Sequence, residues 1–163
     1  MRLLKLALIS AIGLFLLLTA ISLLIPSSVR ISRAIDINAP RAAVLPFVQE
    51  GMNWGKWNEY LVQEKGQWQN KRQWQGSRYA ISLKTKSDSM VQSVWTPMKG
   101  KEFESVYSIM EPRPGIITVQ WYFNFHLGWY PWEKFGSIIY DRQVGPVMEQ
   151  SLTHLKQLVE SNQ

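Results

Sequence analysis

The first 25 residues differ in pattern from the rest of the chain. Residues 6–25 carry no charge and consist mostly of leucine, isoleucine and alanine. As a helix this run is about 30 Å long, at about 1.5 Å per residue, which matches the hydrocarbon thickness of a bilayer. We therefore predict an N-terminal transmembrane anchor at residues 1–25 and one domain at residues 26–163. The alternative is a cleaved signal peptide, for which Ala20-Ile21-Ser22 offers a cleavage site with small residues at its two ends.

The charges beside the apolar run bear on its orientation. Arg2 and Lys5 precede it, and Arg30, Arg33 and Arg41 follow it. Basic flanks tend to stay in the cytoplasm, and here the two flanks nearly balance. The short basic tail favours a cytoplasmic N-terminus, which makes the chain a single-pass membrane protein with its domain outside the cytoplasm.

Beyond the anchor, alternation of apolar and polar residues predicts strands. Residues 29–37 alternate, and aromatic or branched residues recur in the later runs between clusters of turn residues. The longest run places Trp121 and Phe123 on one face and His126 on the other. The later strands are predicted at residues 78–86, 90–96, 102–110 and 116–127.

Helical spacing appears in two places. Asn38 is expected to cap a short helix that ends near Gly51. Apolar residues from Ile138 to Val159 recur at the period of a long C-terminal helix, which Pro146 should kink or divide. Because an antiparallel sheet with one apolar face needs a cover, the fold class is α+β, with a curved antiparallel sheet wrapped around the final helix.

Several short motifs occur in this order along nearly the whole chain. They are Ile35-Asp36-Ile37-Asn38-Ala39-Pro40, Asn53-Trp54-Gly55-Lys56-Trp57, Val119-Gln120-Trp121, Ile138 to Asp141, Gly145-Pro146 and Leu152–Glu160. Their order resembles the START-like superfamily with the helix-grip fold, and most of all its membrane-anchored, polyketide cyclase/dehydrase-like SRPBCC members. The resemblance implies an apolar ligand cavity between sheet and helix, but it transfers no catalytic residues.

Composition excludes several kinds of chemistry. The chain has no cysteine, which rules out disulfides, thiolate metal sites and a cysteine nucleophile. With two histidines a three-histidine metal site is excluded, and we expect neither a metal nor another cofactor. The basic excess between Lys56 and Lys101 is interpreted as solvated strand faces with some attraction to anionic lipid headgroups, so no nucleic-acid partner is expected.

No catalytic residue is predicted. His126 should point away from the hollow, and His154 should lie on the solvent side of the final helix. Glu102 with Glu104, and Asp141 with Arg142 and Glu149, are interpreted as exposed charge groups. The predicted ligand-binding residues are the apolar side chains expected to face the hollow: Trp54, Trp57, Tyr107, Trp121, Phe123, Tyr140, Met148 and Leu152.

These patterns favour a membrane-tethered domain that binds a small hydrophobic or lipid-like molecule without transforming it. The alternatives are a cyclase- or dehydrase-type enzyme, and an interaction module with a filled core that acts on a membrane protein or a chaperone. Truncation of Trp121 or Met148 is expected to weaken ligand binding. Trp129, Tyr130 and Trp132 are predicted either to form a lip of the cavity that touches lipid or to cap the core.

Overall fold

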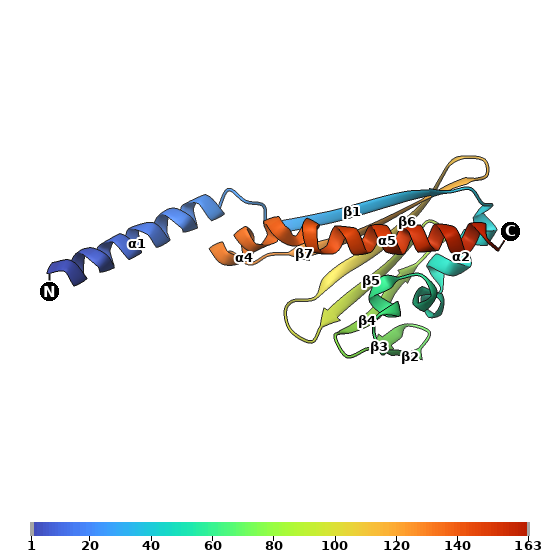
Figure 1. Ribbon diagram of the computed structural model, residues 1–163, viewed down its shortest axis with the longest axis horizontal. Helices are drawn as coiled ribbons and strands as arrows, with labels where there is room; N and C mark the ends of the chain where they lie inside the picture. Colours follow the sequence, from blue (N-terminus) through green and yellow to red (C-terminus); the bar gives the residue numbers. More distant parts are fainter. Residues whose placement is uncertain (1, 163) are drawn as a thin grey trace.

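The computed structural model describes residues 2–162. Its sheet has seven antiparallel strands in the order β1-β7-β6-β5-β4-β3-β2 (Figure 1). The strands are β1 (Ser28–Ile37), β2 (Gln67–Asn70), β3 (Gln73–Gln75), β4 (Tyr79–Lys86), β5 (Met90–Pro97), β6 (Phe103–Arg113) and β7 (Ile116–His126). The helices are α1 (Arg2–Ser22), α2 (Arg41–Gln49), η1 (Gly51–Lys56), α3 (Glu59–Val62), α4 (Pro131–Gly136), η2 (Ser137–Ile139) and α5 (Tyr140–Glu160).

The longer strands lie where alternation predicts them. Every other residue of β7 is buried, from Ile117 through Phe123, which confirms the inward face. Two short strands, β2 and β3, are added in a segment rich in glutamine and tryptophan, outside the predicted strands. The result is an α+β helix-grip architecture, in which the sheet packs against the C-terminal helix.

The final helix differs from its predicted form. α5 continues across Pro146, and the break falls earlier, where α4 and η2 precede Tyr140. Its buried stripe begins later than expected, because Ile138 and Ile139 are 68% and 49% exposed. Met148, Leu152, Leu155 and Val159 form the inward face of the helix.

The start of α2 also corrects an expectation. The N-cap of α2 is Pro40, so Asn38 lies too early in the chain to cap it with its side chain. The backbone N–H of Asn38 instead donates to the Glu160 carboxylate at 2.9 Å, which joins the end of β1 to the end of α5.

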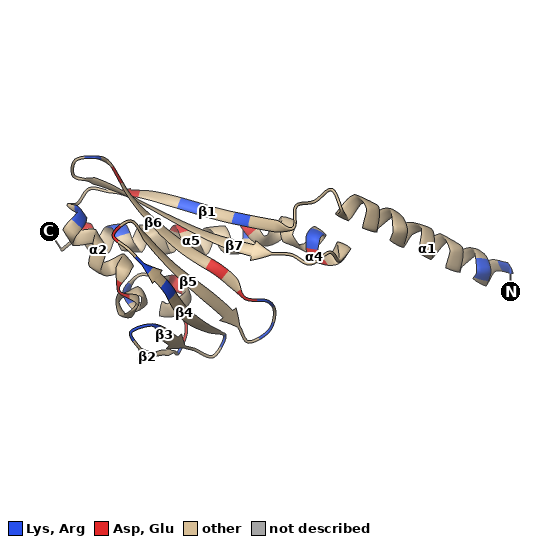
Figure 2. Ribbon diagram, turned by 180° about the vertical axis from the view of Figure 1, so that it is seen from behind, with Lys and Arg blue, Asp and Glu red and all other residues tan. Residues whose placement is uncertain are grey.

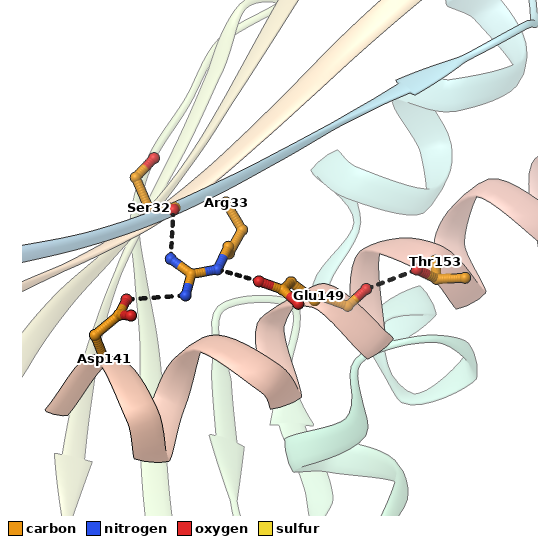
Figure 3. A network of polar contacts seen from close by, with 5 residues as sticks. All are labelled: Ser32, Arg33, Asp141, Glu149 and Thr153. Carbon is orange, nitrogen blue, oxygen red and sulfur yellow. Dashed lines mark hydrogen bonds and ion pairs between the residues drawn. The ribbon is translucent and has the colours of Figure 1, made fainter. Parts of the chain in front are cut away.

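An ion-pair cluster joins the middle of β1 to the first half of α5 (Figure 3). The Arg33 guanidinium lies 2.9 Å from Asp141 Oδ1 and 2.6 Å from Glu149 Oε1. Gly145 leaves room for it, since a Cβ at that position would lie 2.1 Å from Arg33 Nη2. Asp141 and Glu149, which were predicted to form an exposed charge group, therefore hold α5 to β1 through Arg33.

The N-terminal helix extends away from the body of the protein, which we define as residues 28–160. α1 projects from the end of the body where α4 lies, and its side chains are exposed almost throughout (Figure 1). It is the one helix among residues 2–162 that is long and apolar enough to cross a membrane, a property shared by signal sequences.

Two hydrogen bonds hold the segment between α1 and β1. The buried Lys134 of α4 donates its Nζ to the carbonyl of Ile25 at 2.7 Å. The N–H of Leu127 donates to the carbonyl of Ser27 at 2.8 Å. The end of β7 and the start of α4 therefore lie beside the C-terminal end of α1.

Candidate functional site

A pocket of about 190 Å³ lies between the sheet and the first turns of α5. Four strands supply rings from their inward faces, α3 supplies one more, and α5 closes the other side. Its lining is almost entirely aromatic, and consists of Tyr60, Tyr79, Trp95, Phe103, Phe123, Phe125, Tyr140, Gln143 and Val144.

Tyr60 organises the pocket from the short helix α3. Its ring meets Trp95 at 5.6 Å and Phe123 at 6.0 Å between centroids, both edge to face. This geometry is favoured by the quadrupoles of aromatic rings. Burial, together with the neighbouring Tyr79, raises the pKa of Tyr60 well above its ordinary value. The hydroxyl therefore stays protonated well into the alkaline range.

A second hollow, of about 420 Å³, adjoins the pocket and shares Phe103, Phe125 and Tyr140 with it. Its other walls come from the β5–β6 loop, the end of β7 and Glu133 of α4. We call this second hollow the mouth. Because β7 ends beside the C-terminal end of α1, the mouth lies at the same end of the body as the N-terminal helix (Figure 1).

An ion pair connects two walls of the mouth. Lys101 Nζ of the β5–β6 loop lies 2.6 Å from Glu133 Oε2 of α4. The N–H of Gly128 donates to the same oxygen at 2.6 Å. Hydrogen bonds from Lys101 and from Gly128 lower the pKa of Glu133, so the pair persists down to acidic pH. The loop is thereby tied to α4.

Three exposed aromatic residues stand beside the mouth. Trp129, Tyr130 and Trp132 are 60%, 38% and 63% exposed. Tyr130 lies between the two indoles, at 4.4 Å from Trp129 and 4.8 Å from Trp132 between ring centroids. The structure places these rings at the surface. Both predicted roles, contact with lipid and capping of the core, stay predictions.

The structure places two of the eight predicted ligand-binding residues, Phe123 and Tyr140, in the pocket wall. The other six residues are at most 1% exposed, and their packed side chains occupy the half of the expected hollow that lies away from the pocket. These six residues are Trp54, Trp57, Tyr107, Trp121, Met148 and Leu152. Ligand binding by any of the eight stays a prediction.

The filled half holds a buried polar network. Trp121 Nε1 donates to Ser105 Oγ at 2.9 Å, and Asn58 Nδ2 donates to the Tyr107 hydroxyl at 3.0 Å. Burial raises the pKa of Tyr107 far above its ordinary value, against the opposing effect of the hydrogen bonds from Asn58 and Ser105. Satisfied networks of this kind hold side chains in one arrangement, so these hydrogen bonds stabilise the packing of this half of the interior.

Sequence reasoning missed most of the pocket lining. Phe125 follows Phe123 at the two-residue period of β7, and Trp95 and Phe103 occupy inward positions of predicted strands, so alternation alone would have found them. Tyr60 gives no such signal, because α3 is one turn long and lies in a segment without periodicity.

The histidines and paired carboxylates lie outside the aromatic pocket. His126 is exposed and borders the mouth, as does Glu102. His154 Nδ1 lies 2.7 Å from Glu59 Oε1, on the flank of α5. Among residues 2–162, no three histidine or acidic side chains are grouped as metal ligands.

Comparison with solved structures shows the START-like helix-grip fold. A START superfamily protein from Mycobacterium smegmatis superposes with a TM-score of 0.62 at 13% identity, over 82% of this chain and 99% of that one. The di-domain ARO/CYC protein BexL from the BE-7585A biosynthetic pathway gives 0.60 at 14% identity, over 81% of this chain and 46% of BexL. A Thermobifida fusca protein gives 0.60 at 13%, over 80% and 92% of the two chains. No family model and no curated protein sequence matches the chain.

Proposed function

We propose that this chain is a single-pass, membrane-tethered START-like domain that binds a small hydrophobic or lipid-like molecule between its sheet and α5. The observation that carries the proposal is the aromatic pocket, whose lining joins the mouth beside α1. Ligand sites are concave and mostly apolar, with few polar groups, and typically occupy about 300–1,000 Å³. The pocket and the mouth together fall within that range.

The polar groups in the described lining of the aromatic pocket favour binding over catalysis there. They are tyrosine hydroxyls and the amide of Gln143, which orient a ligand through hydrogen bonds. The titratable side chains Lys101, Glu102, His126 and Glu133 lie in the mouth, at the outer part of the proposed site. A cyclase- or dehydrase-type enzyme is the alternative suggested by the structural likeness to BexL. Cyclisation of a linear poly-β-ketone by the purified protein, with loss of water, would establish that alternative.

The ligand is tested directly on the full chain, purified from its own source in a mild detergent. Native mass spectrometry should show a fraction of the protein carrying one small apolar molecule, which organic extraction recovers. After this extraction, a fluorescent fatty acid should bind to the emptied site. If no molecule is retained and the fluorescent fatty acid does not bind, the interaction module with a filled core replaces this proposal.

The tether is proposed from the charge-free run at residues 6–25 and from the exposed, apolar α1. The full chain is expected to stay in membranes through an alkaline carbonate wash, while a chain beginning at Ser27 stays in the supernatant. Burial of about twenty apolar residues in lipid makes release unfavourable at any pH. A mature N-terminus near residue 23 would instead identify α1 as a cleaved signal peptide.

We further propose that Trp129, Tyr130 and Trp132 rest in the membrane interface and form the lip through which ligand passes. Trp129→Ala with Trp132→Ala, in the chain beginning at Ser27, should reduce partitioning into phosphatidylcholine vesicles by roughly tenfold, since each indole buries a large apolar area there. Ligand exchange with the vesicles should slow in parallel.

The matched control for the lip is Met52→Ala with Met110→Ala, which removes exposed apolar side chains from other parts of the surface. It should leave partitioning unchanged. A fall in melting temperature for the tryptophan variant, with partitioning retained, would show that the rings stabilise the fold and do not contact lipid.

A further inference from the structure

A basic groove of about 350 Å³ lies between the α2–η1 junction and β4. Lys71 and Arg72 of the β2–β3 turn line it, together with Lys84 and Lys86 of β4, and Glu50 is the carboxylate in its described lining. Figure 2 shows these basic positions on β4 and in the loop that joins β2 to β3. The cations therefore surround a concave site.

The four cations have no protein partner. Within the described chain, none of their side chains forms an ion pair or a hydrogen bond, whereas Arg33, Arg78, Lys101 and Lys156 all do. Within the described lining of the groove, Glu50 is the one residue of opposite charge, and it forms no ion pair with these cations. A ligand that brings negative charge into the groove would meet donors that are free to bind it.

One wall of the groove is an open strand edge. β3 pairs with β4 only from Ala80 to Ser82, and the last link is the hydrogen bond from Leu83 N–H to the Arg72 carbonyl at 2.8 Å. Beyond it, no strand of the described chain pairs with residues 84–86 on that side. An open edge offers backbone donors and acceptors to an additional strand.

The groove lies at the end of the body farthest from α1. The β4–β5 turn beside it is held to α2 by Gln49 Nε2, which donates to the Ser87 carbonyl at 2.9 Å. α2 follows the far end of β1, and ten residues of strand at about 3.3 Å each place that end about 30 Å from Ser28. Electrostatic attraction is screened over about 8 Å at physiological salt, so headgroups of the membrane beside α1 do not account for this charge.

We propose that the groove binds an acidic, extended segment of a partner protein, which adds as a strand beside residues 84–86. Lysines on an edge repel basic strands and discourage apolar ones, but they attract an acidic strand. Met52 and Leu83 give the groove an apolar floor for the alternate side chains of that strand. The described lining has no aromatic ring on which a base could stack, which disfavours a single-stranded nucleic acid.

The proposal is independent of the aromatic pocket, and its test uses the full chain in phosphatidylcholine nanodiscs. The probe is a fluorescent peptide of alternating Glu and Val residues, with its binding followed by anisotropy. The groove variant carries Lys71→Gln, Lys84→Gln and Lys86→Gln. The control carries Lys65→Gln, Arg113→Gln and Arg142→Gln, which removes the same charge from exposed positions outside the groove.

The groove variant should bind the peptide roughly tenfold more weakly, and the control should stay within about twofold of the parent. A peptide N-methylated at alternate residues, which cannot pair with a strand edge, should lose binding to the unaltered chain. Three outcomes would each overturn the proposal. The two variants could lose the same affinity, the N-methylated peptide could bind as well as the parent peptide, or the groove could bind single-stranded DNA in place of the peptide. Absence of peptide binding would also overturn it. The comparison of the N-methylated peptide with the parent peptide uses only the unaltered chain, so it does not depend on the folding of any variant.

Discussion

Replacing Val144 by tryptophan is expected to lower the affinity for an apolar ligand by about a hundredfold, which corresponds to about 2.7 kcal/mol. Val144 projects from α5 into the wall of the aromatic pocket, whose volume is about 190 Å³. An indole at this position would occupy much of that space and would lie against Tyr140 and Phe125. The measurement is displacement of a fluorescent fatty acid from the full chain in detergent.

The matched control for the pocket is Gln150→Trp, which adds the same ring to an exposed position of α5. It should leave affinity unchanged. The melting temperature of Val144→Trp is expected to stay near that of the parent, because the ring enters existing space. Undiminished binding by Val144→Trp would show that the ligand binds elsewhere, and would remove the main support for the proposed function.

Replacing Trp121 by alanine is expected to lower the free energy of unfolding by about 3–5 kcal/mol. The Trp121 side chain is fully buried and packs against Tyr107 at 5.1 Å and Phe123 at 5.0 Å between ring centroids. Its loss leaves a cavity and also removes the donor to Ser105 Oγ. Because small domains have about 5–15 kcal/mol of stability, a large share of the total would be lost.

Urea denaturation of the chain beginning at Ser27 measures this change. Trp132→Ala is the matched control, since that indole is 63% exposed and its removal should cost no more than about 0.5 kcal/mol. This expectation replaces the view that truncation at Trp121 acts mainly on ligand binding. If Trp121→Ala weakens binding while stability is retained, the pocket extends deeper than its described lining.

Local pattern was sufficient for most elements. Alternation along residues 116–127 determines which side chains of β7 face inward, because successive strand residues point to opposite faces. Helical spacing likewise determined the inward stripe of α5 through Met148 and Leu152. The two short strands β2 and β3 were not predictable in this way, since each is too short to show a period by itself and is held by pairing, β3 with β4 and β2 with β3.

From the residue pattern alone it follows that the inward faces are aromatic and that one face of the sheet needs the final helix as its cover. It also follows that residues 6–25 are long and apolar enough to span a bilayer. Periodicity specifies only the direction in which each side chain points. Whether an inward ring borders open space or packed neighbours depends on what approaches from the opposite side.

Tertiary structure decided that distinction. Trp54 and Trp57 follow α2 into the interior, pack edge-on against Tyr107 at 5.0 Å and 5.6 Å between ring centroids, and fill one half of the space under α5. The other half holds the pocket, which is bordered by Tyr60 from α3 and by the first turns of α5. Such distances between elements remote in sequence follow from the packing of the whole fold, since close packing couples the position of each side chain to all of its neighbours.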